Sequence, residues 1–127
     1  MNEYPQQTID QIIMNYNISE KYNCVVIELK GKIMGGPDAD VFRNELQKLI
    51  DEDKKKVIID LEHVKFMNSS GLGILIGGLT TMRKAGGDIK LCNADKRISS
   101  LLMVSQLNTV FDHHLSLDSA VKAYEAA

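Results

Sequence analysis

The sequence lacks several features that mark common classes of protein. Its net charge at pH 7 is −2 and no strongly basic stretch stands out, so it offers no electrostatic footprint for nucleic acid. No apolar run approaches the ~18 residues that a membrane-spanning helix needs. The first residues, MNEYP, also lack the pattern of a signal peptide. These absences lead us to expect a cytoplasmic protein without membrane insertion.

Cysteine is scarce and histidine forms no metal-binding pattern. Cys24 and Cys92 lie in separate apolar runs, and no Cys-x-x-Cys spacing is present. Buried free thiols suit a reducing compartment, although the sequence leaves a disulfide between the two cysteines open. His113 and His114 are adjacent, and adjacent residues of a strand point to opposite faces, so they are not expected to chelate one metal. We therefore predict no metal site and no cofactor.

Motifs of nucleotide-binding and hydrolytic enzymes are also missing. No Gly-x-x-x-x-Gly-Lys-Ser/Thr loop and no Gly-x-Ser-x-Gly elbow occurs. Gly71, Gly73 and Gly77 come near a dinucleotide-binding fingerprint, but the third glycine falls one position late. We therefore predict no catalytic residues and a protein that is not an enzyme.

The sequence shows strand-like and helix-like segments in alternation, which is typical of an α/β domain. The hydrophobic content of 44% and charged content of 25% are those of an ordinary globular chain. The first two strands are expected to pair antiparallel with a turn near residues 19–23, and the later order predicts parallel strands. The run at 57–61 is almost wholly apolar, which predicts a central strand. Strands are expected at residues 12–18, 22–33, 57–61 and 88–92, and a further short strand is expected to start near residue 110. One helix is expected to start at Pro37, and three others are expected at residues 72–85, 98–105 and 117–126.

The most informative segment is the run FMNSSGLG at residues 66–73, which leads from a strand into a helix. Serine is a favoured N-cap, and the N-terminus of a helix also favours the negative charge of a phosphate. Gly71 beside the two hydroxyls is expected to leave room for the backbone of another protein. The segment therefore predicts a modifiable serine at an exposed helix N-terminus, and the alternative is that the serines only cap the helix.

This run, with VIIDL at 57–61 before it, resembles the core motif of the STAS domain, and in particular that of the bacterial anti-sigma factor antagonists. The resemblance extends to Gly86-Gly87, Leu91-Cys92 and Leu101-Leu102, and it covers roughly residues 12–125. It implies one STAS-type domain over residues 1–127. The implied fold is a mixed sheet of about four to six strands with about four helices packed mainly on one face.

The resemblance also implies a function and a site. In antagonists of this type, a serine is phosphorylated by a GHKL-type kinase that is also the anti-sigma factor, and a metal-dependent Ser/Thr phosphatase reverses the modification. By position this serine is Ser69, and Ser70 is the neighbouring hydroxyl that supports it. The implied protein is a switch that binds the kinase until Ser69 is phosphorylated. The other residues expected to support the site and bind the partner are Met67, Asn68, Gly71 and Leu72.

Two segments depart from the family pattern. Asn68 stands where the antagonists usually have Asp, so the size and one acceptor are kept while the charge is lost. Residues 31–38 depart from the usual Gly-x-Leu/Ile-Asp turn. Asn68 keeps one alternative open, a non-cycling scaffold or accessory STAS subunit of a signalling or transport complex, and the departure at residues 31–38 leaves the identity of the partner open. A third, minor hypothesis is a small ligand-binding or enzymatic domain.

Overall fold

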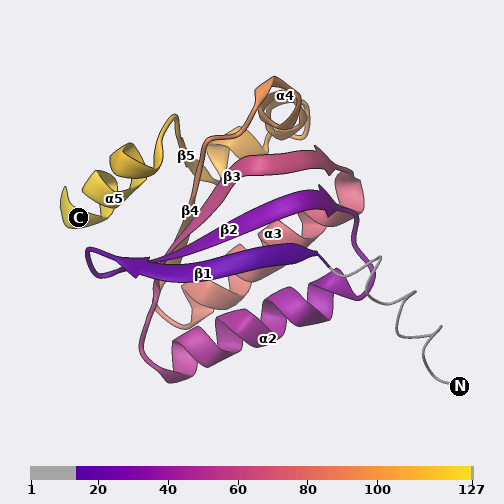
Figure 1. Cartoon of the computed structure of the whole chain (residues 1–127). Coiled ribbons are helices and arrows are strands. Elements are labelled where there is room, and N and C mark those ends of the chain that lie inside the picture. The colour runs from indigo at the N-terminus through magenta and orange to yellow at the C-terminus, as the bar shows by residue number, and fades with distance from the viewer. Residues whose placement is uncertain (1–13, 127) are drawn as a thin grey trace, which may run out of the picture.

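The computed structural model describes residues 14–126, which form a five-stranded sheet with helices on both faces (Figure 1). The strand order is β1-β2-β3-β4-β5, so β3 lies at the centre as predicted. The elements are β1 (Asn15–Lys21), β2 (Cys24–Ile33), α2 (Asp38–Asp51), β3 (Lys56–Met67), α3 (Ser69–Lys84), β4 (Asp88–Cys92), α4 (Lys96–Val104), the 3-10 turn η1 (Leu107–Thr109), β5 (Asp112–His114) and α5 (Leu117–Ala126).

The sheet is mixed, as the sequence predicts. β1 pairs antiparallel with β2, and the other three pairings are parallel. β1 runs on to Lys21, so the predicted turn is narrower and consists of Tyr22 and Asn23. The part of the predicted first strand at residues 12 and 13 lies outside the described residues.

Two other strands differ from the prediction in length or position. β3 continues beyond 61 to Met67 because β2 runs beside it and pairs Ile33 with Met67. The pairing is irregular between Gly31 and Lys32, where the register shifts. β5 begins at Asp112, later than predicted, because residues just before it form the 3-10 turn η1.

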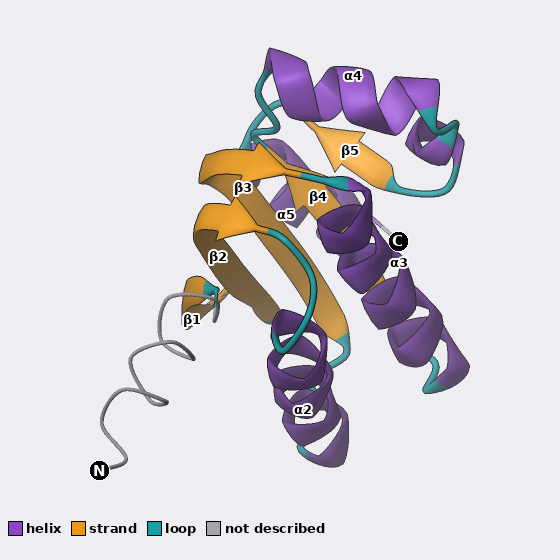
Figure 2. Cartoon of the chain, turned by 90° about the vertical axis from the view of Figure 1, so that its right-hand side faces the viewer, coloured by secondary structure: helices purple, strands orange, loops and turns teal. Residues whose placement is uncertain are grey.

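The main core lies between the sheet and three helices. Figure 2 shows α2 and α3 on the same side of the sheet, and α4 adds buried Ile98 and Leu102 to this core. The predicted apolar face of α3 is confirmed, except that Ile76 is only half-buried and Ile74 is buried as well. The buried apolar residues from α2 and α3 are Phe42, Leu46, Leu49, Leu72, Ile74, Leu75, Leu79 and Met82.

A smaller core on the opposite face is covered by α5. Cys24, Ile58 and Cys92 form its floor, and the helix contributes Ala120, Val121 and Tyr124. Both cysteines are buried and free, which confirms the predicted thiols and excludes the disulfide. Burial, helped by nearby Asp60, raises the pKa of Cys92 to about 12, so this thiol is unreactive near neutral pH.

No helix within residues 14–126 has both the length and the hydropathy needed to cross a bilayer.

Candidate functional site at the start of helix α3

Helix α3 begins directly where β3 ends, and Asn68 alone makes the turn between them. Its backbone is extended, with φ −102° and ψ −177°, and its Oδ1 accepts a hydrogen bond of 2.8 Å from the N–H of Gly71. Its carbonyl also accepts from the N–H of Leu72 at 2.9 Å. Asn68 is therefore the N-cap. The expectation that a serine caps the helix was wrong, because the helix begins at Ser69, three residues before its predicted start at residue 72, and asparagine caps a helix as well as serine does.

The two serines are thereby left without a capping role. Ser69 and Ser70 lie in the first turn of α3, and both are exposed, as predicted for a modifiable hydroxyl. Ser70 rests against the loop that follows β2: a Cβ on Gly35 would come within 2.6 Å of the Cβ of Ser70. Gly35 also has φ +96°, a conformation that favours glycine. The loop and the first turn of α3 therefore form one continuous surface.

Gly71 serves its own chain rather than a partner. It is buried, and a Cβ at this position would overlap the carbonyl of Ile33 at the end of β2. The backbone N–H of Asn68 also donates to that carbonyl at 3.4 Å. The expectation that Gly71 leaves room for another protein's backbone was therefore wrong. Met67 and Leu72 are buried in the main core. They therefore act on the site by packing the end of β3 and the first turn of α3 against that core.

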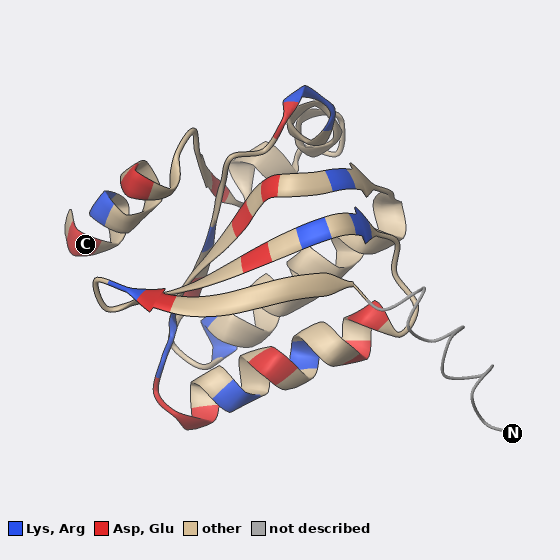
Figure 3. Ribbon diagram, in the orientation of Figure 1, with Lys and Arg blue, Asp and Glu red and all other residues tan. Residues whose placement is uncertain are grey.

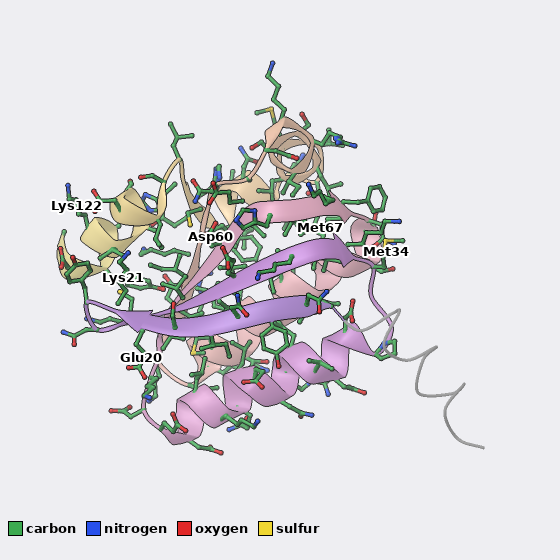
Figure 4. All side chains as sticks on the ribbon, in the orientation of Figure 1. Glu20, Lys21, Met34, Asp60, Met67 and Lys122 are labelled. Carbon is green, nitrogen blue, oxygen red and sulfur yellow. The ribbon has the colours of Figure 1, made fainter. Side chains whose placement is uncertain are left out.

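The surface beside the serines combines apolar and positively charged side chains. Phe66 is 43% exposed and Met34 is 45% exposed. Figure 4 places Met34 at the same end of the sheet as Met67. Lys32, the register partner of Phe66, and Lys65 are both exposed, and the ends of β2 and β3 are accordingly blue in Figure 3. The first turn of α3 carries no acidic residue. The positive end of the helix dipole is thus uncompensated there, which favours an added negative charge.

A buried carboxyl group holds the neighbouring loop in place. Asp38 is 1% exposed, and its Oδ1 accepts a hydrogen bond of 2.6 Å from the N–H of Met14. Burial raises the pKa of Asp38, although backbone hydrogen bonds from Met14 and Met34 act in the opposite direction. Its Oδ2 has no partner among residues 14–126. Asp38 therefore links the start of β1 to the loop that contacts Ser70.

A second polar cluster, which the sequence did not predict, lies at the β5 edge of the sheet. His114 Nε2 is 2.9 Å from Asp112 Oδ2, and His114 Nδ1 is 2.8 Å from Ser119 Oγ. Lys90 Nζ also binds Asp112, at 2.7 Å, which together with His114 lowers the pKa of this carboxyl. The N–H of Ser119 donates to Ser116 Oγ, so it is not free to stabilise an oxyanion. We interpret the cluster as a clamp between β5 and α5, and no sequence motif marks it.

The chain is similar to known proteins in sequence and in fold. The anti-sigma-B factor antagonist of Bacillus subtilis (strain 168) is 29% identical over 99 residues, which make up 78% of this chain and 89% of that protein. The structure of the Bacillus cell fate determinant SpoIIAA in its phosphorylated form has a TM-score of 0.66 at 20% identity. That match covers 87% of this chain and 99% of SpoIIAA, and it shows a shared fold.

The same fold occurs in a different setting. The murine anion transporter Slc26a9, in its inward-facing state, matches 98% of this chain with 24% of its own length. Its TM-score is 0.75 at 15% identity, which again shows the fold alone. The model of the STAS domain family matches residues 15–120. The motif, the fold and this match together show that the chain belongs to the STAS domain family.

Proposed function

We propose that this chain is an anti-sigma factor antagonist, and that the start of α3 is a protein-binding surface controlled by phosphorylation of Ser69. The observation that carries the proposal is the exposed hydroxyl of Ser69 in the first turn of α3, next to a cap that is already satisfied and in a turn without acidic residues. The named role of the Bacillus subtilis relative supports it. The partners in this proposal are a GHKL-type kinase that is also the anti-sigma factor and a metal-dependent Ser/Thr phosphatase.

The mechanism is a local change of charge on a rigid surface. Asn68 holds the turn through Gly71, and Gly71 lies against Ile33, so the serine is presented by fixed backbone. Phosphorylation adds about −1.5 to −2 charges at neutral pH. The helix N-terminus stabilises this charge in the free protein. Burying the same charge beside Phe66 or Met34 in a complex is costly unless the partner offers a cation, so the phosphorylated protein dissociates.

Ser70 has a different role in the proposal. Its contact with Gly35 fixes the loop that presents Met34, so it shapes the partner surface rather than accepting the phosphate. Loss of its hydroxyl is expected to leave phosphorylation of Ser69 in place.

Kinase assays with intact-mass measurement test the acceptor. We expect the wild-type protein and Ser70→Ala to gain one phosphate from the cognate GHKL-type kinase with ATP, whereas Ser69→Ala gains none. Ser69→Asp is expected to bind the unreacted kinase at least about tenfold more weakly than Ser69→Ala, because its carboxylate imitates part of the phosphate charge. Equal affinities of wild type, Ser69→Ala and Ser69→Asp by calorimetry would instead support a non-cycling scaffold.

A further inference from the structure

The two edges of the sheet differ in how they are protected against pairing with another chain. β5 has three residues, and ion pairs and the His114 clamp tie it to Lys90 and α5. β1 has seven residues in uninterrupted register with β2, without proline or a bulge. Its first five residues, NYNIS, carry no charge, and Ile18 in their midst is 38% exposed. Natural edge strands are usually short, charged or interrupted, and β1 is none of these over most of its length.

The hairpin shows which backbone groups of β1 point away from the sheet. Tyr22 and Asn23 have φ of 52° and 68°, as in a two-residue type I′ turn. Such a turn is closed by a hydrogen-bonded pair, here Lys21 and Cys24. Hydrogen-bonded pairs alternate along an antiparallel ladder, so the N–H and C=O groups of Tyr16, Ile18 and Glu20 face outward and are unused by β2.

We propose that two copies of the chain form a symmetric dimer by antiparallel pairing of β1 with β1. A two-fold axis at Ile18 matches the whole strand: Ile18 faces Ile18 of the second copy, and Tyr16 faces its Glu20. The symmetry repeats the Tyr16–Glu20 pair on the other side of the axis, which makes three pairs. Each joins residues with outward backbone groups, so all three are hydrogen-bonded pairs. The pairing covers Ile18 with its own equivalent, and one surface serves both copies, as a closed dimer requires.

The charges of β1 are compatible with this register. Glu20 lies opposite Tyr16 and Lys21 lies opposite Asn15, so no like charges face each other. The Glu20 carboxylate is already bound by Lys54 at 2.7 Å. A register centred on Glu20 would place two carboxylates together and pair fewer residues. Charge and length therefore both select the axis at Ile18.

The dimer would leave the proposed binding surface free. Figure 2 shows β1 at one edge of the sheet, with α3 farther from it than α2. Two Ser69 sites would then be carried by one particle, and this inference does not depend on whether Ser69 is phosphorylated.

Sedimentation of the full chain over about 5–300 µM tests the dimer, a range in which weak homodimers dissociate measurably. We expect a concentration-dependent dimer in wild type. Ile18→Lys should abolish it, because two ammonium groups would meet at the axis. Val104→Lys, which makes the same kind of change at a side chain on α4 that is 83% exposed, should leave the dimer intact. A monomer at every concentration, or a dimer that survives Ile18→Lys, would overturn the proposal.

Hydrogen exchange in the wild-type protein gives a second measurement that needs no variant. The amide of Ile18 should become more protected as the protein concentration rises, while the amides of Asn17 and Ser19, which bond to β2, should keep constant protection. Equal behaviour of the three amides at all concentrations would contradict the proposed register.

Discussion

Helices α2 and α3 both begin at the carboxyl ends of neighbouring strands, β2 and β3, yet their first turns differ in capping and in charge. The strands before them end in register, with Ile33 beside Met67. α2 starts after Pro37, which makes no side-chain cap, and its first turn holds two acidic residues, Asp38 and Asp40. α3 starts after a hydrogen-bonded Asn68 cap and has no acidic residue in its first turn.

The difference shows that a helix start at the carboxyl end of a strand is not by itself enough to form a phosphate-accepting site. The exposed carboxylate of Asp40 already compensates the positive end of α2, so further negative charge gains little there. The positive end of α3 is uncompensated, and the residues exposed in its first turn are small hydroxyls. The composition of one turn therefore determines which of two similar helix starts can accept a phosphate favourably.

The largest predicted effect on stability comes from a substitution that pushes the start of α3 away from β2. Gly71→Ala would force a methyl group into the carbonyl of Ile33, so we expect a loss of about 3 kcal/mol or more in the free energy of unfolding. Gly73→Ala is the matched control, because its Cβ would meet nothing within 4 Å. It should stabilise the protein by roughly 0.5–1 kcal/mol through helix propensity. Urea titration of both variants checks this, and similar midpoints would show that Gly71 is not tightly packed.

A middle-sized effect is expected from the cap itself. Asn68→Ala removes the acceptor for the Gly71 N–H and should cost about 1 kcal/mol of stability. Asn68→Asp keeps the acceptor and adds a charge at the helix N-terminus, which should contribute roughly 0.3–1 kcal/mol and make α3 resemble α2. This gain should shrink in high salt, and its persistence at 1 M NaCl would argue against the dipole as its cause.

Asn68→Asp also tests the departure from the family pattern. If the cognate kinase requires only the local geometry, wild type and Asn68→Asp should be phosphorylated at rates within about tenfold of each other. A wild type that is inert beside a readily modified Asn68→Asp would mean that this chain has left the phosphate cycle. The family assignment would stand in that case, and the proposed switch would not.

The smallest effect is expected at α2 and depends on pH. Because the folded-state pKa of Asp38 is raised, this carboxyl supports folding best when protonated. Its contribution is therefore complete below the ordinary carboxyl pKa and declines as pH rises toward the raised value. Asp38→Asn keeps an oxygen for the Met14 N–H without the buried charge, so its stability relative to wild type should increase through that window and then level off. Thermal unfolding across pH 3–7 measures this, with exposed Asp40→Asn as the control. A constant difference between Asp38→Asn and wild type would contradict it.

Much of the fold could be predicted because turn residues in the sequence mark where several helices and strands begin and end. The bounds of β4 and α5 agree with the prediction, and Gly86 and Gly87 mark the turn before β4. The end of β3 could not be predicted from its own apolar pattern, because it is set by pairing with β2. The cap was ambiguous since residues 68–70 are all capping types. The role of Gly71 depends on Ile33, which is distant in sequence, so only the folded chain shows it.

The contact between Gly35 and Ser70 joins segments that are distant in sequence, so the site exists only in the folded chain. A newly synthesised or misfolded chain contains the same serines, but it does not hold them beside the loop after β2 or above Ile33. An enzyme that recognises this surface therefore distinguishes folded molecules from unfolded ones without a separate check. A short peptide spanning residues 66–73 is accordingly expected to be a poor substitute for the whole domain in any assay of recognition.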